Sequence, residues 1–84
     1  MTILDLQAAL RRERIREDAY GLRGGLPNEA LCLGQTPKGW EVYYSERGEK
    51  SGVRIFADEH SACEDLFRRI CADHTARIKH ERSG

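Results

Sequence analysis

The fold is decided by one stretch of the sequence, Gly39-Trp40-Glu41-Val42-Tyr43-Tyr44-Ser45-Glu46-Arg47-Gly48-Glu49-Lys50-Ser51-Gly52. It contains the only Trp and two of the three Tyr of the 84-residue chain. Aromatic and β-branched residues favour a pleated, half-buried strand. Because side chains alternate across a strand, Trp40, Val42 and Tyr44 share one face, and we expect that face to lie on the core.

A hairpin is predicted where this strand ends. The polar segment from Glu46 to Gly52 contains two glycines, which are free to adopt positive φ in a turn. Val53-Arg54-Ile55-Phe56 then returns as the next strand. Phe56 is too large to be exposed, so either this strand bulges or Phe56 turns under the element that follows.

The N-terminal part of the chain predicts a helix and a first hairpin. A helix is expected from residue 2 to about residue 18, with Thr2 as its N-cap. Residues 19–22 suggest a short strand, and the glycines and Pro27 of 23–28 suggest a loop. Residues 29–34 read as a strand with Leu31 and Leu33 facing inward, joined to the aromatic strand by a turn at 36–39.

A second helix is predicted after the last strand. Asp58 or Ser61 caps it, and an apolar stripe at three-and-four spacing continues it to about Lys79. The tail, residues 80–84, is expected to fray. The predicted fold is therefore α+β, a single two-layer domain over residues 1–84. It runs helix, three or four antiparallel strands, helix, with both helices on one face of the sheet.

The composition limits the classes of function. Charged residues make up 33% of the chain, with 14 basic and 14 acidic side chains, so a general nucleic-acid binder is not expected. No apolar run is long enough for a membrane span, and no secretion signal is evident at the N-terminus. Three cysteines without framework spacing fit reduced thiols. We therefore expect a cytoplasmic protein.

No motif indicates a metal, a cofactor or catalysis. Cys71-x-x-His74 and His60-x-x-Cys63 each place two possible ligands one helical turn apart, but roughly three turns, about 16 Å, separate the pairs. Acidic residues lie beside arginines or in polar turns, which offers no carboxylate with a raised pKa. We therefore expect neither an enzyme nor a bound metal or cofactor.

The order of elements resembles that of the double-stranded-RNA-binding domain. That family contacts phosphates through a lysine cluster at the start of its last helix. Here the equivalent positions read Asp58-Glu59-His60-Ser61-Ala62-Cys63-Glu64-Asp65, whose acids would repel phosphates. RNA binding therefore remains an alternative that only the order of helices and strands supports.

Three segments resemble a group of small bacterial immunity proteins. These segments are Gly24-Gly25-Leu26-Pro27-Asn28-Glu29, Trp40 to Gly48 with its Tyr-Tyr-Ser-Glu-Arg-Gly string, and Phe56 followed by Ala62-Cys63. Such proteins are encoded beside polymorphic or contact-dependent toxins and block the toxin by binding it. The resemblance covers about residues 20–70, and it implies a cognate toxin domain as the partner. The arginine-rich segment 11–16 lies outside it.

The expected partner-binding surface lies around the hairpin, because Tyr and Arg often dominate protein interfaces. It comprises Tyr43, Ser45, Glu46, Arg47, Glu49 and Arg54, with Asn28 and Glu29 nearby. If the toxin is a nuclease, Glu41, Glu46 and Glu49 could mimic phosphates and steer association. A stand-alone protein-interaction module of the same fold is the remaining alternative.

Overall fold

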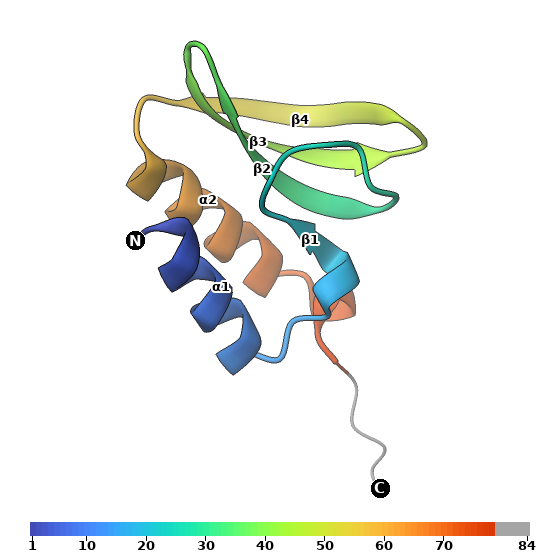
Figure 1. The fold of residues 1–84 in the computed structure, drawn as a ribbon. Helices are drawn as coiled ribbons and strands as arrows, with labels where there is room; N and C mark the ends of the chain where they lie inside the picture. Colours follow the sequence, from blue (N-terminus) through green and yellow to red (C-terminus); the bar gives the residue numbers. More distant parts are fainter. Residues whose placement is uncertain (79–84) are drawn as a thin grey trace, which may run out of the picture.

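The computed structural model describes residues 1–78, and β3 (Gly39–Glu46) is an interior strand of its sheet. Four strands lie in the order β1-β2-β3-β4 (Figure 1). β2 (Ala30–Thr36) and β4 (Glu49–Phe56) pair with β3 on either side, and both pairs are antiparallel. The aromatic stretch therefore forms the predicted strand at the centre of two hairpins.

The first strand differs in direction from the prediction. β1 (Tyr20–Gly21) pairs with β2 in parallel, so the sheet is mixed rather than wholly antiparallel. The reason is the segment 22–29, which carries the chain back along the sheet before β2 begins. Because this crossover returns the chain to the end of the sheet where β1 began, β2 runs in the same direction as β1.

Both hairpin turns contain two residues between their strands. The first follows the predicted turn, with Pro37 and Lys38 between β2 and β3. In the second, Arg47 and Gly48 both have positive φ, at 55° and 77°, as a type I′ turn requires. The predicted tip from Glu46 to Gly52 is therefore too long, because residues 49–52 already belong to β4.

A bulge in β4 decides which of its side chains face the helices. Val42 is opposite Arg54, whereas Tyr44 is opposite Ser51, so β4 holds one extra residue at this point. Gly52 takes a φ of +59°, the left-handed conformation that such bulges favour. The prediction that this strand contains a bulge is thus confirmed.

Beyond the bulge, apolar residues of β4 lie on both of its faces. Phe56 pairs with Trp40 and packs against the core. Val53 and Ile55 point to the opposite face, where they are 46% and 58% exposed. The bulge therefore turns two apolar residues to solvent and directs Arg54 toward the helices.

The first helix is shorter than predicted. α1 (Ile3–Arg12) begins with a capping box between Thr2 and Asp5 and ends six residues before residue 18. Arg14 has a φ of +62°, which breaks the helix. Ile15 is then buried and bridges to Arg77. The helix ends because burying Ile15 against the C-terminal segment requires the chain to turn.

The second helix is also shorter than predicted. α2 (Glu59–Cys71) has Asp58 as its N-cap, whose carboxylate accepts a hydrogen bond from the Ser61 amide at 2.7 Å. The helix ends at Cys71, and Ala76 is buried in the short η2 (His74–Ala76) that follows. A continued helix could not bring Ala76 and Arg77 back against Ile15. The predicted frayed tail lies outside the described residues.

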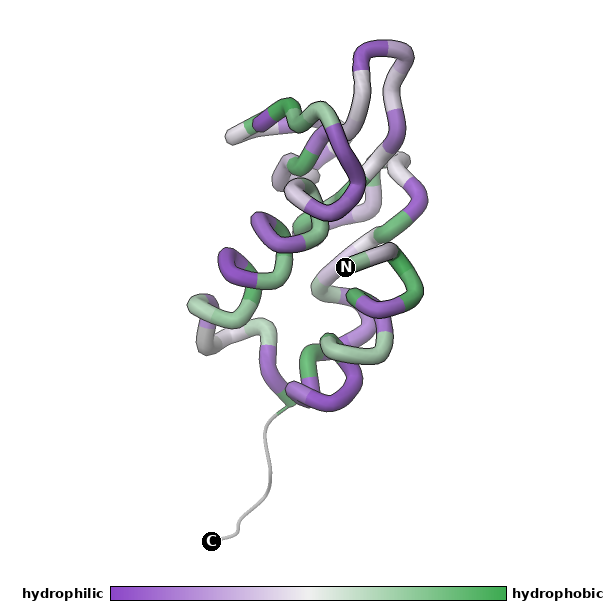
Figure 2. The backbone as a smooth tube through the Cα atoms, turned by 90° about the vertical axis from the view of Figure 1, so that its left-hand side faces the viewer, coloured by the Kyte–Doolittle hydropathy of each residue, from purple (hydrophilic) through white to green (hydrophobic). Residues whose placement is uncertain are grey.

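Both helices lie on the same side of the sheet, as predicted (Figure 1). α2 contacts β2, β3 and β4, and α1 packs beside α2 (Figure 2). η1 (Glu17–Ala19) links α1 to β1. The core between these layers includes Leu6, Leu10, Leu33, Val42, Leu66 and Ile70. Trp40 and Tyr44 are half-buried on this face, so the predicted inward face of β3 is confirmed.

Candidate functional site

Tyr43 and Ser45 lie on the outer face of the sheet, but they are not exposed. Both are fully buried beneath the loop that connects β1 to β2. The Tyr43 hydroxyl donates to the Gly25 carbonyl, and the Ser45 hydroxyl donates to the Pro27 carbonyl, each at 2.6 Å. The prediction that they belong to an exposed binding surface is wrong. They hold the glycine loop on the sheet instead.

Replacing Tyr43 by Phe tests this role through the pH dependence of stability. Burial raises the pKa of Tyr43 to about 12, with Cys32 and Glu41 adding to the effect. Because the folded pKa exceeds the usual value near 10, this stabilising contribution is complete below about pH 10 and is lost as the pH rises toward 12. Tyr43→Phe should cost about 1 kcal/mol at pH 7, since the Gly25 carbonyl loses its donor.

The same variant should lose less stability than the wild type between pH 9 and pH 11.5, by up to about 2 kcal/mol. Urea denaturation at pH 7 and across this alkaline range measures both effects. Cys63, whose pKa burial raises to about 11, should leave some alkaline loss in both proteins. An identical pH dependence in the two proteins would show that Tyr43 does not control this loss.

Five of the predicted site residues do meet at the exposed end of the second hairpin. These are Asn28, Glu29, Glu46, Arg47 and Glu49, and all five are exposed. The side chain of Asn28 accepts a hydrogen bond from the Arg47 amide at 3.4 Å, which ties the glycine loop to the turn. We call these five residues the hairpin end.

The hairpin end is acidic. Glu46 and Glu49 are directly opposite each other across the two strands. Glu29 precedes β2 next to Glu46, since Ala30 is paired with Ser45. Like charges facing each other across strands are unfavourable. Three carboxylates and one guanidinium leave a net charge of about −2 at this end of the sheet.

The pKa of the neighbouring Tyr44 is raised, first by burial and then by the negative charges of Glu46, Glu29 and Asp73. Tyr44 also lines a hollow of about 260 Å³ between β2, β3 and the C-terminal part of α2. Glu29, Arg69 and Asp73 contribute charged groups to this hollow. It therefore borders the hairpin end on the helix side of the sheet.

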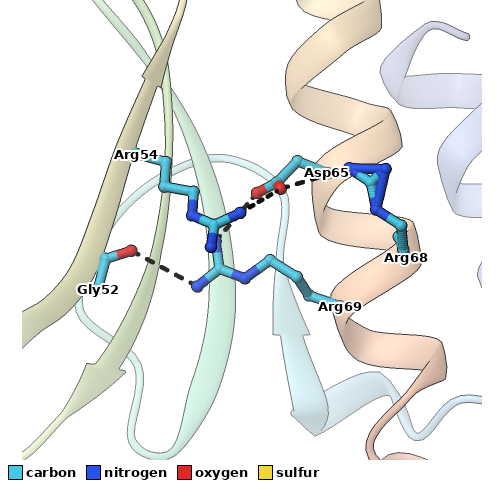
Figure 3. Close-up of polar contacts among 5 residues, drawn as sticks. All are labelled: Gly52, Arg54, Asp65, Arg68 and Arg69. Atoms are coloured by element: carbon cyan, nitrogen blue, oxygen red, sulfur yellow. Dashed lines mark hydrogen bonds and ion pairs between the residues drawn. The ribbon is translucent and has the colours of Figure 1, made fainter.

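Arg54 does not join the hairpin end, although the sequence grouped it there. The bulge directs Arg54 toward α2, where its Nη1 donates to Oδ1 of Asp65 at 3.0 Å (Figure 3). Arg69 donates to Oδ2 of the same carboxylate at 2.9 Å, and Nη2 of Arg68 lies 3.7 Å from Oδ1. We call Arg54, Asp65, Arg68 and Arg69 the arginine cluster.

Asp65 and Arg68 are site residues that sequence reasoning missed. Asp65 and Arg69 form an ordinary ion pair one helical turn apart. Asp65 is only 2% exposed, however, although other charged residues of α2, such as Glu64 and Arg68, lie on its exposed face. The available signal was its position three residues after Ala62 and next to Leu66, on the apolar face of α2. A carboxylate on such a face needs cationic partners.

Glu41 also departs from its predicted role. Its carboxylate is paired with Nζ of Lys50 at 2.7 Å, and the same ammonium lies 4.5 Å from the centre of the Tyr43 ring. Glu41 is therefore neutralised within the fold, which leaves Glu46 and Glu49 as the candidates for phosphate mimicry.

The cysteines and the possible metal ligands of residues 1–78 bear on whether the protein has a nucleophile or a metal site. Within that range, no three His, Cys, Asp or Glu side chains are grouped so that they could hold a metal ion. Cys32, Cys63 and Cys71 are free thiols, and burial raises the pKa of each. A thiol with a raised pKa is a poor nucleophile at neutral pH.

The comparisons with known proteins leave the family open. Scans against protein-family models, curated proteins and solved structures gave no match to this chain. Among the described helices, none is both long and apolar enough to cross a membrane. The candidate site therefore rests on the chain's own geometry, which places the hairpin end and the arginine cluster along β4.

Proposed function

We propose that this protein binds a cognate bacterial toxin domain in the cytoplasm and neutralises it by direct contact. The observation that carries the proposal is the exposure of β4, which lies at the edge of the sheet with all but its last residue in solvent. Val53 and Ile55 are exposed on this strand between charged groups. Apolar side chains surrounded by polar ones are typical of a protein interface.

The charges on β4 support a protein partner with a patterned surface. The hairpin end has a net charge of about −2, and the arginine cluster, with three guanidiniums and one carboxylate, has about +2. The neutral total of the chain therefore conceals two groups of opposite net charge. Complementary patches on a partner would fix its orientation and speed its association.

The proposal is tested by co-expression with the protein encoded beside it. Production of that protein alone should stop bacterial growth, and production together with this chain should restore growth and yield a complex that co-purifies. Growth restored without a complex would contradict inhibition by direct contact. A stable complex with a harmless neighbour would instead identify a stand-alone interaction module.

RNA binding is the second candidate, favoured only by the order of helices and strands. At the start of α2, where that family carries lysines, Asp58 caps the helix and the Glu59 carboxylate accepts from the Ile3 amide at 2.8 Å. Acids in these positions disfavour a phosphate backbone. A mobility shift with double-stranded RNA that weakens strongly with salt would support this candidate over toxin binding.

A further inference from the structure

We propose that the arginine cluster is a binding site for carboxylate side chains of the protein partner. This inference rests on the proposed function and names the chemistry that the partner must present. It assigns Arg54 and Arg68 as the recognition residues and Asp65 and Arg69 as the residues that position them.

The first argument is the way the guanidiniums are held. Asp65 is nine-tenths or more buried, so its carboxylate is fixed in the packed face of α2. Arg69, half-buried, bonds to Asp65 and also donates to the Gly52 carbonyl at 3.5 Å, which ties α2 to the bulge of β4 (Figure 3). This pair completes the structural link between helix and strand.

The second argument is the cationic surface that remains after this link. The side chains of Arg54 and Arg68 are 61% and 71% exposed, yet each is within 4 Å of the fixed carboxylate. A guanidinium presents five donors in a planar fork, and one shared carboxylate cannot occupy them all. Two oriented guanidiniums thus have donors directed to solvent, where they can bind carboxylate oxygens in pairs.

The third argument selects a folded acidic surface over a nucleic acid. A duplex carries one negative charge per roughly 1.7 Å of its axis, so it needs a long basic track. The arginine cluster is short, and the two elements that form it also carry exposed acids, Glu64 on α2 and Glu49 at the start of β4. One or two carboxylates on a protein match this site, whereas a phosphate backbone would also meet the acids.

The probe is a fluorescein-labelled twelve-residue peptide of alternating Glu and Ser, measured by fluorescence anisotropy at low salt. Arg54→Lys with Arg68→Lys keeps both charges and removes the planar forks. We expect this double variant to bind the peptide about tenfold more weakly than wild type. Arg11→Lys with Arg12→Lys, at exposed positions of α1, is the matched control and should bind like wild type.

Asp65→Asn provides a second test of positioning. It makes the chain more cationic, so an effect of overall charge would tighten binding, whereas loss of the fixed carboxylate should weaken it. If this variant does not fold, the double variant Arg54→Lys with Arg68→Lys still tests the inference. Absence of peptide binding in the wild type, or equal losses in the two lysine pairs, would overturn the inference. So would displacement of the peptide by double-stranded RNA of equal charge at lower concentration.

Failure of this inference differs from failure of the proposed function. Peptide binding that depends on Arg54 and Arg68, without protection against the toxin, would retain the carboxylate site and remove the toxin as partner. Protection against the toxin that is unchanged in the lysine pair, without peptide binding, would retain the function and remove this site.

Discussion

Replacing Gly39 by Ala is expected to destabilise the protein by at least about 3 kcal/mol. Gly39 begins β3 with a φ of +135°, a conformation that residues with a side chain rarely adopt. A Cβ atom there would lie 2.4 Å from the Phe56 carbonyl oxygen, which is backbone and belongs to the end of β4. The strand pair Trp40–Phe56 would therefore have to separate.

Gly48→Ala is the matched control for this prediction. Gly48 also has positive φ, at 77°, but a Cβ atom would meet nothing within 4 Å. Gly48→Ala should therefore lower the stability only by the strain of placing Ala in a left-handed conformation, about 1–2 kcal/mol. Thermal melts should show a loss of roughly 12 °C or more for Gly39→Ala and about half of that or less for Gly48→Ala. Equal losses would mean that the close approach of β3 to Phe56 does not constrain the fold.

The second large effect is expected on binding rather than on folding. Glu46→Lys should weaken the complex with the toxin partner by about 2–5 kcal/mol, because a partner cation would be left facing a lysine. The same change should leave the domain as stable as before or slightly more so. It replaces the unfavourable Glu46–Glu49 pair by an opposite-charge pair.

Calorimetric titration of the purified partner measures this loss, and circular dichroism confirms that the variant is folded. Arg47→Glu, at the tip of the same turn, should weaken binding in the same way. Glu17→Lys, at an exposed position of η1, makes the same change of charge away from β4 and serves as the control. A loss below about 1 kcal/mol would place Glu46 at the rim of the interface. Wild-type binding by both hairpin variants would remove the hairpin end from the site.

The alternation of side chains in β3 was enough to predict the core face of the sheet. Trp40, Val42 and Tyr44 face the helices because the period of a strand is two and that face is apolar. The same alternation placed Tyr43 and Ser45 on the outer face correctly. It could not show that residues 24–28 fold back over them, because a loop with two glycines has no periodicity.

The course of β4 illustrates a second limit of the sequence. One extra residue at Gly52 reverses the faces of the strand, so Arg54 points to α2 and Ile55 to solvent. Without the bulge, Arg54 would have faced outward, on the same side of the sheet as Tyr43 and Ser45. The arginine cluster could not be predicted, because it joins Arg54 to Asp65 only through this change of register.

The helix ends show a third limit, set by long-range contacts. Charged residues at 11–18 are compatible with a continued helix, yet the chain leaves it so that Ile15 can pair with Arg77. The Arg77 guanidinium also donates to the Glu13 carbonyl at 2.7 Å. These contacts join residues 62 and 64 positions apart, which no local pattern reveals.

Hydrogen–deuterium exchange of this chain, alone and in complex with its toxin partner, tests the central proposal most directly. Direct contact through β4 predicts slower exchange in the complex at the amides of residues 46–56 and 28–29, with α1 unchanged. Protection confined to α1 and the arginines of 11–16, or no difference between the free and the mixed protein, would contradict the proposal.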